Sequence, residues 1–165
     1  MSGSLLITNR QRAIRLNMRL LRAIAKSLLT ETLELEEFDL AICIVGAPEM
    51  ARLNKTFLQH EGSTDVITFD YADNPTRTPD PGPRTLHGEM FICIDDALSQ
   101  AKQFRTSWPG ELTRYVIHGV LHLQGFDDLQ PVARRKMKRE ENRLLKEIAR
   151  RFPLSKLAGR PKLAE

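Results

Sequence analysis

Short runs of apolar and β-branched residues alternate along this chain with segments of helical periodicity, and this alternation restricts the fold more than any other feature. The apolar runs predict strands at residues 5–9, 40–45, 64–71 and 89–94. The periodic segments predict helices at residues 14–28, 49–58, 95–104, 109–123 and 131–151. This order, without an internal repeat or a long linker, predicts one mixed α+β domain.

Turn-forming residues and charge set the expected limits of that domain. Residues 73–84 hold four of the nine prolines and predict a loop. Pro131 is a favourable first-turn residue for the last helix. We expect one domain over residues 1–152, followed by a basic, flexible tail over residues 153–165.

The composition excludes several classes of protein. No run approaches the roughly 20 apolar residues of a membrane span, and the N-terminus has no pattern of a secretory signal. The only two cysteines, Cys43 and Cys93, lie inside apolar runs, which favours buried thiols over a disulfide framework. We therefore expect a cytoplasmic protein with no membrane contact.

Positive charge is concentrated in two parts of the chain. Residues 131–165 carry 12 Lys and Arg against 4 Asp and Glu, whereas residues 1–130 carry 13 against 17. The first predicted helix also has a polar side that is entirely positive. Both segments suggest an anionic partner such as RNA, although a solvated helix surface explains the same pattern. The candidate RNA-binding residues are Arg15, Arg19, Arg22, Lys26, Arg134, Arg135 and Lys138.

Two of the four histidines carry the clearest chemical signal. His118 and His122 are four residues apart in a segment of helical periodicity, so both imidazoles face one side of a helix. Gly125 follows, where the chain can turn back, and Asp127 or Asp128 can then bring a carboxylate to the same place. Two imidazoles, one carboxylate and a position left for water describe a catalytic zinc site.

The residues themselves leave other interpretations open. The spacing matches that of the metzincin proteases, but Gly119 occupies the place of their general-base glutamate. A residue without a side chain cannot act as a base, so a metal hydrolase other than this kind of protease is indicated. Two buried histidines that are satisfied by hydrogen bonds would show the same spacing without any metal.

Several segments resemble, in order, the motifs of the YbeY family of endoribonucleases that mature ribosomal RNA. The segment HGVLHLQGFDD resembles the family's HGxLHLxGYDH, and ELTRYVIHGVLHL resembles the helix that carries it. Upstream, STDVITFDY resembles the family's TDVLSF strand, and HGEMFICIDDA resembles its next strand and helix. The matches cover roughly residues 36–130.

The resemblance implies a fold, an activity and a site. The fold is α+β, with a small mixed sheet packed with helices and one Zn²⁺ at the end of the motif helix. The activity is metal-dependent, single-strand-preferring endoribonuclease action in 16S rRNA 3′-end processing and ribosome quality control. The implied partners are the 16S rRNA precursor and the ribosome or small subunit, with a ribosomal protein as a further candidate. The metal ligands are His118, His122 and Asp128.

This chain departs from the family pattern at two places. Asp128 stands where the family has a third histidine, which makes the site more negative and favours harder metals. Leu58 stands where the family has an arginine, and an apolar side chain cannot stabilise charge on a phosphate in the transition state. His60 and Asp127 are the remaining candidates for a catalytic role. The alternative for His60 is a polar residue of a loop. The alternative for Asp127 is a residue that supports a metal ligand by a hydrogen bond or forms a turn.

Three alternatives to the nuclease hypothesis remain at this point. The chain could be a ribosome-assembly factor that binds rRNA or a ribosomal protein with little nuclease activity, which the loss of the arginine favours. It could be a metal hydrolase with another substrate. It could also be an interaction module in which the histidines belong to the core.

Overall fold

Four strands form one mixed sheet in the computed structural model, which describes residues 2–59, 64–72 and 85–159. The strands are β1 (Ser2–Asn9), β2 (Glu37–Val45), β3 (Val66–Asp70) and β4 (Thr85–Cys93). Their order is β1-β2-β4-β3, in which β1, β2 and β4 are parallel and β3 is antiparallel to β4. The predicted small mixed sheet is therefore confirmed.

Five α-helices complete the domain, in the predicted order. They are α1 (Met18–Ser27), α2 (Ala47–Leu53), α3 (Ile94–Phe104), α4 (Trp108–Leu123) and α5 (Pro131–Arg151). Short helical turns follow α1, α2 and α5, namely η1 (Leu28–Thr32), η2 (Asn54–Leu58) and η3 (Leu154–Leu157). The α+β class is confirmed, and the predicted loop over residues 73–84 lies outside the described residues.

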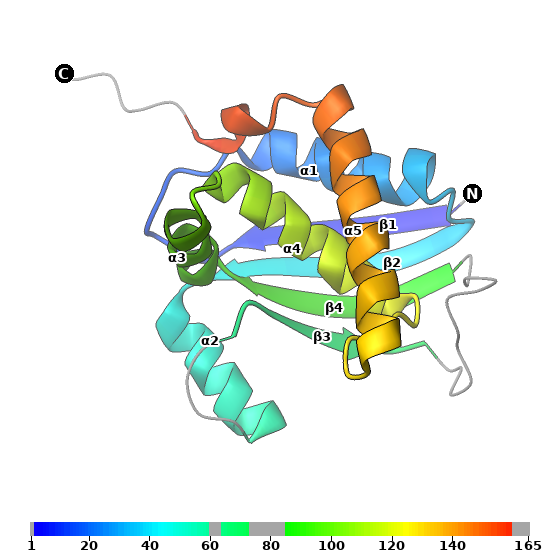
Figure 1. Cartoon of the computed structure of the whole chain (residues 1–165), viewed down its shortest axis with the longest axis horizontal. Coiled ribbons are helices and arrows are strands. Elements are labelled where there is room, and N and C mark those ends of the chain that lie inside the picture. The colour runs from blue at the N-terminus through cyan, green and yellow to red at the C-terminus, as the bar shows by residue number, and fades with distance from the viewer. Residues whose placement is uncertain (1, 60–63, 73–84, 160–165) are drawn as a thin grey trace.

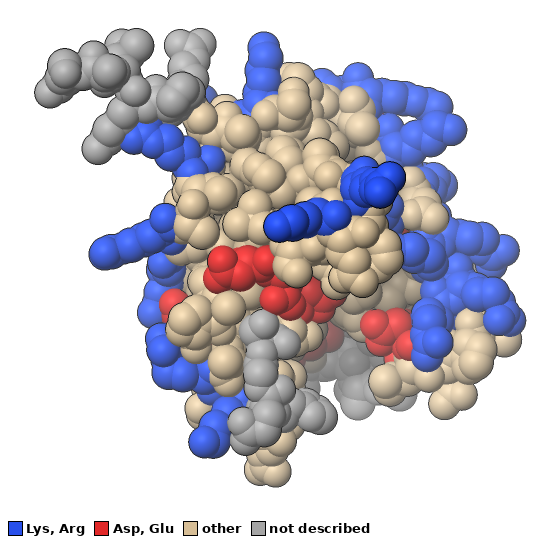
Figure 2. Space-filling model, turned by 60° about the vertical axis from the view of Figure 1, so that its left-hand side comes forward, with Lys and Arg blue, Asp and Glu red and all other residues tan. Residues whose placement is uncertain are grey.

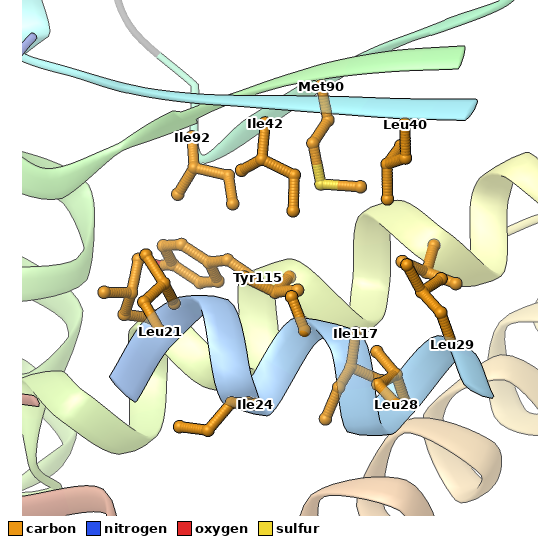
Figure 3. Close-up of a cluster of buried hydrophobic side chains, with 14 of the residues drawn as sticks. Leu21, Ile24, Leu28, Leu29, Leu40, Ile42, Met90, Ile92, Tyr115 and Ile117 are labelled. Carbon is orange, nitrogen blue, oxygen red and sulfur yellow. The ribbon is translucent and has the colours of Figure 1, made fainter. Parts of the chain in front are cut away.

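The main core lies between one face of the sheet and the helices α1 and α4. Side chains from β2 and β4, including Leu40, Ile42 and Met90, point toward these two helices (Figure 3). The helix α5 crosses over α4 on the side away from the sheet (Figure 1). The helix α4 is therefore covered on two sides, which explains why ten of its 16 residues are buried.

A smaller core lies on the opposite face of the sheet, beneath α2. It contains Cys43, Met50 and Cys93, and both cysteines are buried and free, as predicted. Burial raises the pKa of the Cys93 thiol to about 11. This thiol is therefore protonated and unreactive at neutral pH.

The first helix begins later than the periodicity predicts. The Asn17 side chain accepts a hydrogen bond from the backbone N–H of Leu20 at 3.1 Å and caps α1 there. Upstream, the Gln11 side chain bonds both the N–H and the C=O of Ile14 and holds that residue outside the helix. Apolar spacing continued through Ile14, but the cap decides where the helix begins.

The expected flexible tail does not begin at residue 153. Leu157 is fully buried, and Ala158 forms an antiparallel bridge with Leu16. The backbone N–H of Gly159 also donates to the C=O of Arg15 at 2.9 Å. The chain as far as Gly159 therefore packs on the segment before α1, and residues 160–165 lie outside the described residues. None of the helices in the described ranges is long and apolar enough to cross a membrane.

Candidate metal centre

The helix α4 brings His118 and His122 to one position. Its N-terminus is capped by Ser107, whose hydroxyl oxygen accepts from the N–H of Gly110 at 3.2 Å. At 3.6 residues per turn the two histidines share a helix face, and their rings meet edge to face with centroids 4.6 Å apart. The two Nε2 atoms are 3.0 Å apart.

Gly119 lies between these histidines in sequence, on the part of the helix surface that faces the sheet. A Cβ atom there would be 2.8 Å from Sδ of Met90, which is fully buried on β4. The small residue lets α4 approach the sheet closely. A glutamate at this position would therefore press against the buried side chain of Met90.

A Schellman turn ends α4 and reverses the chain toward the histidines. The N–H of Phe126 donates to the C=O of Leu121, and that of Gly125 to the C=O of His122, both at 3.0 Å. Gly125 has φ of 102°, a conformation that side chains disfavour. This reversal brings Asp128 beside the two imidazoles.

The three side chains form the one group of metal-binding type found among the described residues. Oδ2 of Asp128 lies 3.7 Å from Nε2 of His118 and 3.5 Å from Nε2 of His122. Ligand atoms at about 2.0–2.1 Å from a tetrahedral zinc ion are roughly 3.3 Å apart. The separations of 3.0 to 3.7 Å therefore fit one ion without a change of backbone.

The Nδ1 atoms of the two histidines, which face away from the proposed ion, have different acceptors. Nδ1 of His118 lies 2.9 Å from Oε2 of Glu141, and Nδ1 of His122 lies 3.2 Å from the C=O of Phe126. A proton on each Nδ1 satisfies these acceptors and leaves both Nε2 lone pairs facing Asp128. The tautomers that these contacts favour are the ones that metal binding requires.

The surroundings of the two histidines shift their pKa values in opposite directions. Burial alone would lower the pKa of His118, but the hydrogen bond and charge of Glu141 outweigh it and raise the pKa above its ordinary value. Burial and the neighbouring His118 lower the pKa of His122. Burial alone would raise the pKa of Glu141, but the hydrogen bonds from His118 and Arg114 bring it down to about 2.

A cleft of about 520 Å³ opens beside the three side chains. His118, Asp128 and Asp65 line it, and so do four cations from α4 and α5, namely Arg114, Arg134, Arg135 and Lys138. Arg134 also donates through Nε to the C=O of Asp128 at 3.0 Å. Two of the three predicted metal ligands, His118 and Asp128, thus share one cleft with the predicted basic residues of α5.

Those other candidate residues that the structure describes, apart from His122, do not line this cleft. Arg15, Arg19, Arg22 and Lys26 belong to α1 and the segment before it, and Arg22 donates to the C=O of Leu5 at 2.6 Å. Asp127 accepts from the N–H of Leu129 at 2.9 Å, which is the contact of a turn residue. Leu58 is 44% exposed, and His60 lies outside the described residues.

Charge is unevenly distributed elsewhere on the surface. Figure 2 shows a face on which acidic side chains gather near the middle, whereas most of the Lys and Arg side chains lie toward the edges. The positive net charge therefore does not produce a uniformly basic surface. The position of the cations relative to the cleft indicates more about an anionic partner than the net charge does.

Two residues of the cleft, Glu141 and Arg114, were not among the predicted site residues. Glu141 is 5% exposed and its Oε1 accepts from Arg114 at 2.6 Å. A signal for Glu141 is present in the sequence, because it is the one acid on the buried stripe of α5. The other members of that stripe are Met137, Leu144 and Ile148.

Comparisons with known proteins agree with this geometry. The family described as Endoribonuclease YbeY matches residues 6–149. The chain belongs to the YbeY family. Several relatives bear the name Endoribonuclease YbeY. The one from Salinibacter ruber is 33% identical over 66% of this chain and 69% of its own. The one from Myxococcus xanthus is 38% identical over 78% and 42%, and the one from Alkaliphilus metalliredigens is 28% identical over 90% and 97%.

A solved structure shows the same fold. The solution structure of TM1509 from Thermotoga maritima superposes with a TM-score of 0.65, at 21% identity, over 93% of this chain and 94% of that one. In the present chain, which belongs to the YbeY family, the motif helix is α4, and the glycine of the motif forms the turn that returns Asp128. The resemblance inferred from the motifs is therefore confirmed.

Proposed function

We propose that this protein is a metal-dependent endoribonuclease, with a preference for single-stranded RNA, that acts in the cytoplasm in ribosomal RNA maturation. The processing of the 16S rRNA 3′ end and ribosome quality control are the roles in which we place it. The observation that carries the proposal is that three potential ligand atoms meet beside a cleft lined by four cations. Membership of the YbeY family supports RNA as the substrate.

His118, His122 and Asp128 would hold one Zn²⁺ through Nε2, Nε2 and Oδ2. A bound zinc ion supplies Lewis-acid chemistry and lowers the pKa of a water ligand. Compared with a third histidine, Asp128 adds one negative charge and therefore weakens that effect. It also makes a harder divalent metal a competitor for the site.

The cationic side of the cleft would hold the RNA backbone. Arg134, Arg135 and Lys138 lie on the first two turns of α5, beside the proposed ligands. Contacts of this kind give salt-dependent affinity with little readout of sequence. The cations of α1 would form a second, separate contact with RNA.

The first experiment combines metal analysis with cleavage of a 16S rRNA 3′-precursor fragment by wild type and by His122→Ala. We expect about one metal ion per wild-type chain and cleavage of the fragment, with both lost in the variant. Cleavage would show that an arginine at the position of Leu58 is dispensable here. If wild type holds metal but leaves the RNA intact at several salt concentrations, catalysis by the isolated protein is refuted.

A role as an assembly factor without nuclease activity is not favoured by these findings. The separation of the three ligand atoms fits a metal site, whereas binding to a ribosomal protein requires none. Peptide hydrolysis is disfavoured too, because Gly119 occupies the place of the protease glutamate and no acidic residue stands between the two histidines.

A further inference from the structure

We infer that Glu141 is a positioning residue that fixes the ring of His118 for metal binding and connects it to the cationic side of the cleft. This inference rests on the proposed function, since it concerns the metal centre proposed above. It assigns a role to a residue of α5 that the motif on α4 does not contain. The proposed ligands lie on α4 and the turn after it, whereas the carboxylate that contacts His118 lies on α5.

Both carboxylate oxygens of Glu141 have hydrogen-bond partners, and the partners of the two oxygens differ. Oε2 faces Nδ1 of His118 at 2.9 Å. Oε1 accepts from Nη1 of Arg114 at 2.6 Å and from Nζ of Lys138 at 3.3 Å. A carboxylate that is only 5% exposed would be costly without such partners. The three contacts therefore hold Glu141 in one orientation.

The contact with Oε2 selects the tautomer of His118. The carboxylate only accepts hydrogen bonds, so the facing Nδ1 carries a proton. In the neutral ring Nε2 is then unprotonated, and it faces Nε2 of His122 and Oδ2 of Asp128. The opposite tautomer would place a proton between the proposed ligands and block the ion.

The contacts of Oε1 extend this arrangement into the cleft. Arg114 also donates to Oδ1 of Asn142 at 2.8 Å, which fixes its guanidinium between α4 and α5. Lys138 is 59% exposed at the cleft. The same carboxylate that orients a proposed ligand thus restrains two cations of the cleft, Arg114 and Lys138, and Lys138 is one of those proposed to hold RNA.

The test compares Zn²⁺ affinities, measured by competition with a chromophoric chelator at neutral pH. Glu141→Gln keeps the shape of the side chain but removes the charge, and Glu140→Gln is the matched control at the preceding residue. Glu140 pairs with Arg143 and does not line the cleft. We expect the dissociation constant of Glu141→Gln to rise about 10- to 100-fold, and that of Glu140→Gln to stay within about twofold.

Arg114→Gln tests whether the effect of Glu141→Gln comes from the orientation of His118 or from a general change of packing between α4 and α5. It removes one partner of Oε1 of Glu141 and leaves the contacts of Glu141 with Lys138 and His118. We expect its Zn²⁺ dissociation constant to stay within about threefold of wild type, well below the change expected for loss of a ligand's support. An equal loss of affinity in Arg114→Gln and Glu141→Gln would overturn the inference.

A measurement on wild type keeps the inference testable if Glu141→Gln does not fold. In protein loaded with Zn²⁺ and labelled with ¹⁵N-histidine, NMR should show His118 protonated at Nδ1 and bound to metal through Nε2. Metal binding through Nδ1 would overturn the inference.

The outcomes also separate this inference from the proposed metal centre. If His122→Ala loses Zn²⁺ while Glu141→Gln binds it as wild type does, only the role of Glu141 is refuted. If wild type itself does not bind Zn²⁺, or His122→Ala binds it equally well, the metal centre is refuted as well.

Discussion

Oδ2 of Asp128 lies 3.5 Å from Nε2 of His122, although the backbone between them leaves the helix and reverses. The reversal depends on two hydrogen bonds to the last turn of α4 and on the positive φ of Gly125. The third ligand is therefore supplied by the geometry of a helix end, and the first two by the period of the helix.

Substitutions at Asp128 should show whether its carboxylate takes part in metal binding. We expect Asp128→Ala to weaken Zn²⁺ binding by at least about 100-fold, the upper end of the loss seen for outer-shell partners. Asp128→His, which has the residue of the family pattern, should retain binding. The measurement is chelator competition with both variants, and Asp127→Ala is the control. Equal affinity of Asp128→Ala and wild type would remove Asp128 from the ligand set.

Gly125→Ala should destabilise the turn that returns Asp128. A side chain at φ of 102° is strained, and we expect a loss of about 1–2 kcal/mol in the free energy of unfolding. Asparagine tolerates positive φ better, so Gly125→Asn should lose less. Urea denaturation of the metal-free proteins measures both. A loss in Gly125→Asn that exceeds the loss in Gly125→Ala would contradict this explanation.

Gly119→Glu, which completes the protease pattern, should not produce a peptidase. The new side chain would enter the contact between α4 and β4, where Met90 is 2.8 Å from the position of Cβ. Overpacking alone costs about 1–3 kcal/mol, and a buried carboxylate adds to it. We expect a lower melting temperature than that of Gly119→Ala, measured by circular dichroism. A variant as stable as wild type would show that the helix can move away from the sheet.

The stability of the metal-free protein should depend on Glu141 in acid. Its pKa is about 2 in the folded state against an ordinary 4.5. The contribution is therefore complete above the ordinary pKa and is lost as pH falls toward the folded one. A shift of this size corresponds to roughly 3 kcal/mol at most.

Urea denaturation over a series of pH values tests this dependence. The difference in free energy of unfolding between wild type and Glu141→Gln should shrink as pH falls below the ordinary pKa of a glutamate. His118 acts in the opposite direction, because its pKa is raised and its contribution is lost as pH rises. Glu140→Gln again serves as the control. A difference that stays constant through the acid range would contradict the assignment.

The salt dependence of RNA binding should identify the cations that contact the backbone. We expect Arg135→Gln, in the cleft, to weaken binding of single-stranded RNA and to reduce the slope of log affinity against log salt by about 1. Arg150→Gln is the control, because this exposed residue in the last turn of α5 does not line the cleft. Fluorescence anisotropy at several salt concentrations measures both. Equal slopes for Arg135→Gln and wild type would exclude a phosphate contact there.

Element order, the mixed α+β class and the meeting of His118 and His122 were predictable because they depend on short-range patterns. Spacing alone left Asp127 and Asp128 both open as the third proposed ligand, and the resemblance to the YbeY family favoured Asp128. Periodicity shows which residues share a helix face, and the glycine after His122 indicates a turn. The start of α1 at Met18 was harder to predict from the sequence, because it depends on a side-chain cap by Asn17. The packing of Leu157 was also missed, since its burial requires the segment before α1.

The sequence by itself thus determined the helix that carries His118 and His122, and the turn that can return Asp128. Only the tertiary structure decided that Glu141 supports His118 and that the cations of α5, and not those of α1, lie beside the proposed ligands. The reason is physical: a helix specifies neighbours within about one turn, whereas the crossing of α5 over α4 depends on the packing of the whole core.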